Sequence, residues 1–118
     1  MSTAPIIRAE PMLPMRQLLA HLPRLPISDN GAVDANRASP GLLRSVAEDA
    51  EATMSTIHQG LGAIGLLAHS AVPIEDGSIG ADSLESLGFL MAELGDLAAA
   101  CMTLAAHCRR AADHRPIS

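Results

Sequence analysis

A chain of 118 residues forms at most one ordinary domain. Its hydrophobic content of 48% is enough for a core, but with one Phe and no Trp or Tyr that core must consist mainly of aliphatic side chains. The formal net charge is −5. Region 39–113 is the acidic part, with ten Asp and Glu residues against three Arg. Binding to nucleic-acid phosphates needs a basic surface, so this composition argues against direct nucleic-acid binding through residues 39–113 and permits docking onto a basic partner.

Residues 1–38 are predicted to form a loose, proline-bearing leader. Within it, residues 12–22 have the pattern of a short helix, with Pro14 in the first turn and Pro23 at the end. The apolar residues repeat at helical spacing: Met15, Leu18, Leu19 and Leu22. A helix of this length is unstable alone, so it either docks on the rest of the chain or frays. We interpret residues 27–38 as a linker with a turn at Asp29-Asn30-Gly31.

A long helix is predicted over about 39–70, with Ser39 as N-cap and Pro40 in the first turn. Its apolar residues follow heptads. Position a holds Leu43, Ala50, Ile57 and Ile64, position d holds Val46, Thr53, Gly60 and Leu67, and position e holds Ala47, Met54, Leu61 and Ala68. Three glycines, at 60, 62 and 65, each cost roughly 1 kcal/mol relative to Ala in a helix. They indicate a kink or the close approach of another backbone.

A second long helix is predicted over about 82–113, with Asp82 as cap and Glu85 as the second half of a capping box. Its apolar stripe covers three heptad positions, a, d and e, and position e holds Leu84, Met91, Ala98, Ala105 and Ala112. The expected core and dimer seam lies along positions a and d and comprises Leu87, Leu90, Leu94, Leu97, Cys101 and Leu104. The opposite side carries few charges. A helix that is apolar nearly all round is expected to be covered on more than one side.

These features predict an all-α fold in which a long antiparallel helical hairpin spans residues 39–113, followed by a short tail at 114–118. A lone hairpin leaves half of each apolar stripe exposed to solvent, so two copies are expected to pair into a four-helix bundle. The alternative is a three-helix monomer with residues 12–22 folded back. We favour the homodimer, because an 11-residue helix spans only about 16 Å of the seam.

The sequence contains no motif for a cofactor, a metal or a catalytic centre. Cys101 and Cys108 lie seven residues apart on one helix, about 10 Å by helical rise, so they do not bond to each other. They are interpreted as reduced core thiols of a cytoplasmic protein. Zinc would need closely spaced ligand pairs, which His107 and the two cysteines do not form. Membrane insertion is not expected either, since polar residues, three glycines and a proline interrupt the apolar stretch 52–74.

The spacing from Arg109 to His114 resembles the ribonuclease motif of helical HEPN-type nucleases, which implies RNA cleavage at a dimer interface. The family places Asn, Asp or His after the Arg, whereas this chain has Arg110. An ordinary basic helix end, which complements the helix dipole, is the favoured interpretation. The protein is therefore not expected to be an enzyme.

Two surfaces are candidate sites for a protein partner. The first is a shallow groove on the far side of the second helix, formed by Gly88, Phe89, Ala92, Gly95, Ala99 and Met102. It is suited to helix-in-groove recognition, although the same residues equally fit the second half of a dimer core. The second is an acidic face formed by Glu48, Asp49 and Glu51, with Asp96 as a possible contributor from the other helix.

The stretch 86–95, SLGFLMAELG, resembles small uncharacterised helical-hairpin proteins of proteobacterial prophages and plasmids. That resemblance implies a mobile-element inhibitor that binds a host nucleic-acid-binding complex. We thus predict a non-enzymatic protein–protein interaction module whose partner is another protein. The alternatives are a small dimeric regulator whose arginine-bearing leader contacts nucleic acid, and the HEPN-like ribonuclease. The leader's arginines are Arg8, Arg16, Arg24 and Arg37.

Overall fold

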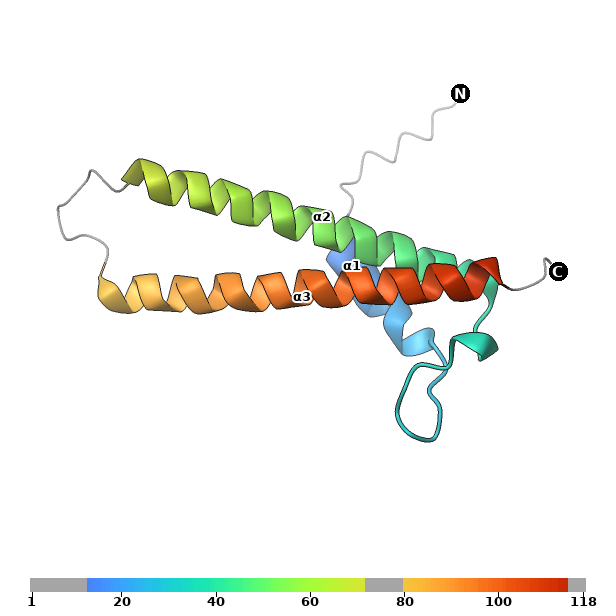
Figure 1. Cartoon of the computed structure of the whole chain (residues 1–118). Coiled ribbons are helices and arrows are strands. Elements are labelled where there is room, and N and C mark those ends of the chain that lie inside the picture. Colours follow the sequence, from blue (N-terminus) through green and yellow to red (C-terminus); the bar gives the residue numbers. More distant parts are fainter. Residues whose placement is uncertain (1–12, 72–79, 115–118) are drawn as a thin grey trace, which may run out of the picture.

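Two long helices lie side by side and run in opposite directions, and a shorter N-terminal segment packs against one end of them (Figure 1). The computed structural model describes residues 13–71 and 80–114. The elements are α1 (Pro14–His21), the 3-10 helices η2 (Leu22–Arg24) and η3 (Ala35–Arg37), α2 (Pro40–Ala71) and α3 (Ala81–Asp113). Within the described ranges there is no β-strand, only an isolated bridge between Ile27 and Val33. The prediction of an all-α fold is confirmed.

The start of α2 follows directly from its sequence. The side-chain oxygen of Ser39 accepts a hydrogen bond from the backbone N–H of Leu42 at 3.1 Å, and Pro40 occupies the first helical position. The start of α3 differs from the prediction. Gly80 is its N-cap, no side chain caps it, and Asp82 lies inside the first turn. The capping box of Asp82 and Glu85 is therefore wrong, although a carboxylate in the first turn still complements the helix dipole.

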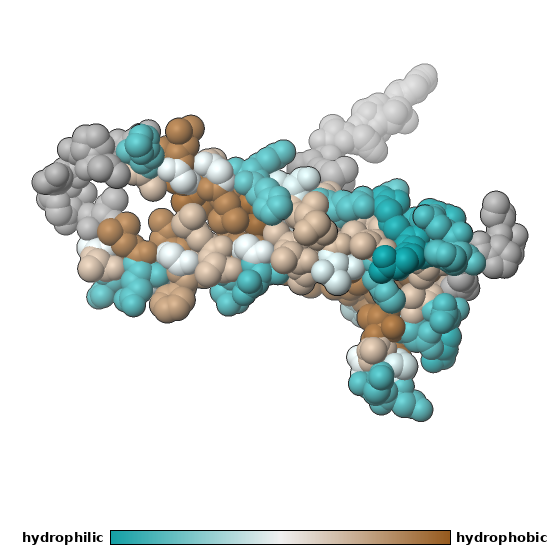
Figure 2. Space-filling model, viewed as in Figure 1, coloured by the Kyte–Doolittle hydropathy of each residue, from teal (hydrophilic) through white to brown (hydrophobic). Residues whose placement is uncertain are grey.

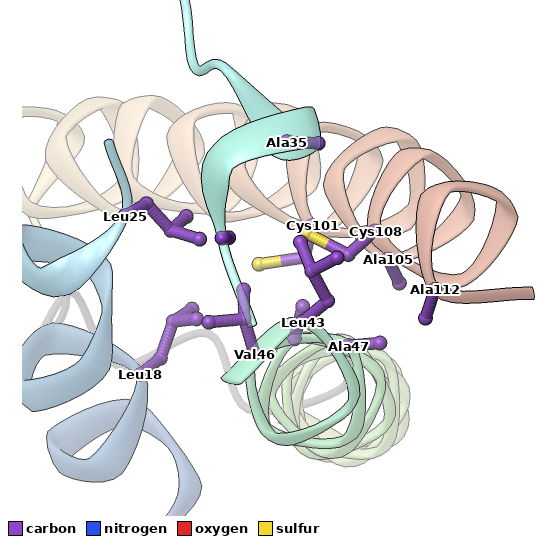
Figure 3. Close-up of a cluster of buried hydrophobic side chains, with 12 residues drawn as sticks. Leu18, Leu25, Ala35, Leu43, Val46, Ala47, Cys101, Ala105, Cys108 and Ala112 are labelled. Atoms are coloured by element: carbon purple, nitrogen blue, oxygen red, sulfur yellow. The ribbon is translucent and has the colours of Figure 1, made fainter. Parts of the chain in front are cut away.

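One cluster of buried side chains joins all three segments of the chain (Figure 3). Leu18 and Leu25 reach it from the N-terminal segment, Leu43 and Val46 from α2, and Cys101, Cys108 and several alanines from α3. Leu43, Val46 and Cys108 are fully buried. Burying a side chain such as Leu or Val stabilises the fold by roughly 1.5–3 kcal/mol. The core therefore sits at one end of the α2–α3 pair, where the N-terminal segment adds a third layer.

The docking of this segment corrects the prediction of a loose leader through residue 38. Leu18, Leu25, Ala35 and Ala38 are all buried in the common core. The short helix predicted over 12–22 is present as α1, and it folds back against α2. The turn predicted at Asp29-Asn30-Gly31 is also present: Gly31 has a φ of +86°, which glycine adopts readily. The parts of the leader, inter-helix turn and tail that fall in 1–12, 72–79 and 115–118 lie outside the described residues.

The buried face of α3 is narrower than the expected seam. Its five buried residues occupy heptad positions a and e: Ala98, Cys101, Ala105, Cys108 and Ala112. The position-d residues Leu104 and Ala111 are half-buried, and Leu97 and Leu90 are 44% and 51% exposed. All five buried residues are Ala or Cys. Small side chains let α3 lie close to α2, which supplies the larger Leu43, Val46 and Ile57.

Burial divides the α2–α3 pair into two halves. In the proximal half, residues 40–57 and 98–113, both helices contribute fully buried side chains, and the N-terminal segment packs there. In the distal half, residues 58–71 and 81–97, no side chain that the structure describes is fully buried. Six large apolar residues of the distal half are exposed: Leu66, Leu67, Leu84, Phe89, Leu90 and Leu97.

Candidate interaction surfaces

The outer side of α3 carries the chain's single aromatic residue in an exposed position. Phe89 is 68% exposed and Met102 is 55% exposed. Of the other predicted groove residues, Gly88, Ala92 and Ala99 are exposed and Gly95 is half-buried. A Cβ built at Gly88 or Gly95 meets no atom within 4 Å. The described chain therefore fills none of the space beside these glycines, and the predicted groove residues share an open face.

Four carboxylates surround Phe89 on this face. Asp82, Glu85, Glu93 and Asp96 lie seven and four residues before it and four and seven residues after it. Positions three, four and seven apart share one side of a helix. All four are exposed, and none forms an ion pair with another described residue. We call these carboxylates and the six predicted groove residues the Phe89 surface. It combines an apolar centre with an acidic margin.

Figure 2 shows how hydrophobic and hydrophilic residues are distributed over one face of the molecule. Hydrophobic residues lie at the surface over the distal parts of both long helices, whereas hydrophilic residues dominate the surface around the proximal end. A patch of exposed apolar residues rimmed by polar ones is typical of protein interaction sites.

The alternative acidic face is not a single free surface in the structure. Asp49 is 9% exposed, and its Oδ2 lies 2.6 Å from Nδ1 of His21 on α1. Glu51 forms a two-point ion pair with Arg109, with Nε to Oε2 and Nη2 to Oε1 both at 2.7 Å. Glu48 is exposed, and Asp96 belongs to the Phe89 surface. Two of the four predicted residues thus contact other elements of the fold, Asp49 through α1 and Glu51 through α3.

The Glu51–Arg109 pair changes the ionisation of both groups. Hydrogen bonds from Arg109 lower the pKa of the Glu51 carboxyl below its usual value of 4.5, and its positive charge acts in the same direction. The carboxylate in turn raises the pKa of the guanidinium. Both side chains are more than 40% exposed, so solvent screens the pair and its net contribution to stability is small.

These contacts also bear on the ribonuclease pattern. Arg109 is held by Glu51, and the Nδ1–H of His114 donates to the backbone carbonyl of Arg110 at 2.7 Å. Both candidate catalytic side chains therefore have structural partners.

In the described part of the chain, no three His, Cys, Asp or Glu side chains lie close enough together to hold a metal ion. Cys101 and Cys108 are buried free thiols, and burial raises the pKa of both.

The predicted seam residues lie in three different environments. Cys101 is buried in the core, Leu87, Leu94 and Leu104 are half-buried, and Leu90 and Leu97 are exposed. The seam is thus a closed contact at the proximal end and an open apolar surface at the distal end.

Three of the four leader arginines lie in the described part of the chain, and all three are exposed on the N-terminal segment: Arg16, Arg24 and Arg37. Arg8 lies outside the described residues.

Among the described helices, α3 is the one long and apolar enough to cross a membrane by length and composition, with 17% of its most apolar window buried. A membrane span needs about 20 residues. Every stretch of that length on α3 contains Asp96, and all but the last also contain Glu93. A charged residue near the bilayer centre costs at least about 2.5 kcal/mol.

Comparison of the chain with family models, curated proteins and solved structures finds no match in any of the three. The spacing of the four carboxylates around Phe89 is visible in the sequence, because residues four and seven apart lie on one side of a helix. The His21–Asp49 contact joins residues 28 apart and carries no local signal.

Proposed function

We propose that this protein is a non-enzymatic interaction module that binds another protein through the Phe89 surface. The observation that supports this most strongly is the exposed Phe89, which shares its helix face with four exposed carboxylates that form no ion pair with another described residue. Aromatic anchors carry a large share of the energy in protein interfaces, and a charged margin steers the approach of the partner. The chemistry fits a partner with an apolar hollow or helix bordered by Arg or Lys.

We further propose that α2 and α3 form a helical hairpin, and that the protein acts as a homodimer whose hairpins form a four-helix bundle. The exposed leucines of the distal half support this, because an apolar face of this kind is normally covered. A cytoplasmic inhibitor that occupies the basic surface of a nucleic-acid-binding complex is a concrete version of this function, and the acidic margin of the Phe89 surface supports it. The partner is a protein in either version.

The test of the proposed binding site uses the full chain as bait in an extract of its host, with the variants Phe89→Ala and Leu66→Ala beside the wild type. Leu66 is equally exposed, at 68%, and belongs to α2, so it is the matched control. Once identified, the partner is titrated against all three proteins. Phe89→Ala is expected to weaken binding by at least about 30-fold, which corresponds to roughly 2 kcal/mol. Equal affinity for wild type and Phe89→Ala would refute the assignment.

The salt dependence of binding distinguishes the contribution of the acidic margin from that of the apolar centre of the Phe89 surface. Interactions of exposed carboxylates are screened over about 10 Å at 0.1 M ionic strength, so the association rate is expected to fall as salt rises. The apolar contact of Phe89 remains at high salt.

We also expect unstructured RNA to stay intact in the presence of the protein. Cleavage that His114→Ala abolishes would instead support the ribonuclease.

A further inference from the structure

The flank of the α2–α3 pair that the N-terminal segment covers continues, uncovered, into the distal half. On α2 this flank is marked by Asp49, which contacts His21 of α1, and by Thr56, which lines a shallow hollow together with Leu13. Steps of three or four residues keep to one side of a helix, and from Thr56 they lead to exposed residues: Gly60, Ala63 and Leu67. This side of α2 is therefore occupied over residues 49–56 and open beyond them.

On α3 the corresponding row follows heptad position d. Glu51 and Arg109, both at position b, form their ion pair on one flank of the contact between the two helices. Successive residues are about 100° apart around a helix, so position d lies on the other flank. Leu90 and Leu97 occupy position d in the distal half and are exposed, and Glu93 lies between them on the same side. We call these residues the open flank: Gly60, Ala63 and Leu67 of α2, and Leu90, Glu93 and Leu97 of α3.

The residues beneath the open flank are also incompletely covered. In the proximal half, the residues of α3 at positions a and e face α2 and are fully buried. In the distal half, Leu87, Met91 and Leu94 at the same positions are only half-buried, and so are Leu61 and Ile64 of α2. Two helices alone thus leave their facing side chains partly open to solvent here. A third helix on the open flank would cover them, as the N-terminal segment does in the proximal half.

We infer that the open flank is the docking site of a basic amphipathic helix of the protein partner. This inference rests on the proposed binding of a protein partner and names the element that the partner contributes. Residues 58–71 of α2 are about 21 Å long by helical rise, so the docked helix has about 14 residues. It takes the place that a second copy would hold in the proposed homodimer, and its binding separates the two copies.

The N-terminal segment shows which kind of helix this side of the pair accepts. Residues 13–27 contain Arg16, His21 and Arg24 and no Asp or Glu, and their apolar residues are mostly leucines. In α1, Leu18 is buried in the core, and His21, three residues later, contacts the carboxylate of Asp49. A leucine thus points inward and a histidine meets a carboxylate at the edge. The open flank offers the same receiving pattern, because its exposed leucines lie on both sides of a carboxylate.

Charge distinguishes a partner helix from a second copy. Residues 58–71 and 81–97 contain four carboxylates and no Lys or Arg. A second copy that covers the open flank with its own distal half therefore brings further carboxylates toward Glu93, which forms no ion pair with another described residue. A basic helix buries the same leucines and places an opposite charge beside Glu93. Such complementarity favours one partner over another at a shared surface.

The first experiment compares two synthetic peptides of the expected length with blocked ends. One has leucines at helical spacing with lysines beside them, and the other has glutamates in place of the lysines. Binding of each peptide to the full chain is measured by fluorescence anisotropy at low salt. The lysine peptide is expected to bind at least about tenfold more tightly, because its charges are opposite to those of the distal half. Equal binding of the two peptides would refute a basic occupant.

The second experiment locates the lysine peptide. Leu90→Ala/Leu97→Ala is expected to weaken its binding at least about tenfold, whereas Phe89→Ala, on the outer side of α3, should change it by no more than about twofold. Circular dichroism checks that both variants keep the helix content of the wild type. A larger loss for Phe89→Ala would place the peptide on the Phe89 surface and refute the assignment to the open flank.

The third experiment leaves the leucines unchanged and tests charge alone. Glu93→Gln is expected to weaken binding of the lysine peptide about threefold, as for an exposed ion pair. Glu85→Gln removes the same charge from the outer side of α3 and should have no such effect. A peptide with glutamines in place of the lysines should bind both variants and the wild type equally. Equal losses for the two variants would refute the contact with Glu93.

The fourth experiment measures mass by light scattering with and without the lysine peptide. The wild type alone is expected at twice the 12.2 kDa of one chain, and in saturating peptide at the mass of one chain with one peptide. A dimer that keeps its mass in saturating peptide would refute the displacement of a second copy. A wild type that is monomeric from the start and binds the peptide would refute the homodimer alone, and it would support the open flank as the site of a partner helix.

Discussion

The two halves of the α2–α3 pair have the same kind of sequence and different surroundings. Both contain a heptad-like succession of apolar residues, yet the proximal half buries twelve residues in its two helices and the distal half buries none whose side chain is described. In the proximal half, α2, α3 and the N-terminal segment all contribute side chains to one buried cluster. Two helices alone do not enclose a core, and the third element decides which leucines are buried.

The polar contacts follow the same division. The His21–Asp49 hydrogen bond and the Glu51–Arg109 ion pair both lie in or beside the proximal half. The four carboxylates of distal α3 form no ion pair with described residues. Acidic residues therefore contact other elements of the fold at one end, and at the other end they are exposed without an ion pair to a described residue. The following predictions test this comparison, from the largest expected effect to the smallest.

The largest contrast is expected between two Leu→Ala substitutions on α2. Leu43 is fully buried in the proximal core and Leu66 is 68% exposed in the distal half. Leu43→Ala should reduce the free energy of unfolding by about 2–5 kcal/mol, since it leaves a cavity. Leu66→Ala should change it by no more than about 0.5 kcal/mol. Urea unfolding followed by circular dichroism measures both, and similar losses would mean that the two halves do not differ.

A smaller effect of opposite sign is expected at Thr53. Its side chain is 1% exposed, and its hydroxyl has no hydrogen-bond partner in the described structure. An unpaired buried polar group costs about 1–3 kcal/mol, so Thr53→Val should raise the unfolding midpoint. Thr56→Val, at an exposed position of the same helix, controls for helix propensity. A lower midpoint for Thr53→Val alone would show that the hydroxyl has a partner, such as a buried water.

The smallest effect is expected from Glu51→Gln. Because the folded-state pKa of Glu51 lies below its usual value of 4.5, the ion pair stabilises the fold above about pH 4.5. This stabilisation disappears as the pH falls through the lowered pKa. The variant should therefore be less stable than wild type at pH 7, by up to about 1 kcal/mol, and equal to it at the acid end. A difference that persists at the lowest pH would point to packing instead of charge.

The sequence by itself determined the helices. Ser39-Pro40 sets the start of α2, the apolar periodicity sets the faces of both long helices, and Pro14 begins α1. These are local effects of capping, backbone geometry and side-chain spacing, which act within a few residues. They also placed Phe89 on the outer side of α3.

The tertiary structure decided which of those faces are covered. It docked α1 on the proximal half and placed Asp49 and Glu51 in contact with other elements of the fold. Of the predicted apolar stripe of α3 it buried residues at positions a and e, and it left position d half-buried or exposed. None of this follows from periodicity, because a heptad pattern gives the direction of a side chain along its own helix. Burial depends on whether another segment reaches that side chain, and contacts such as His21–Asp49 join residues far apart in the chain.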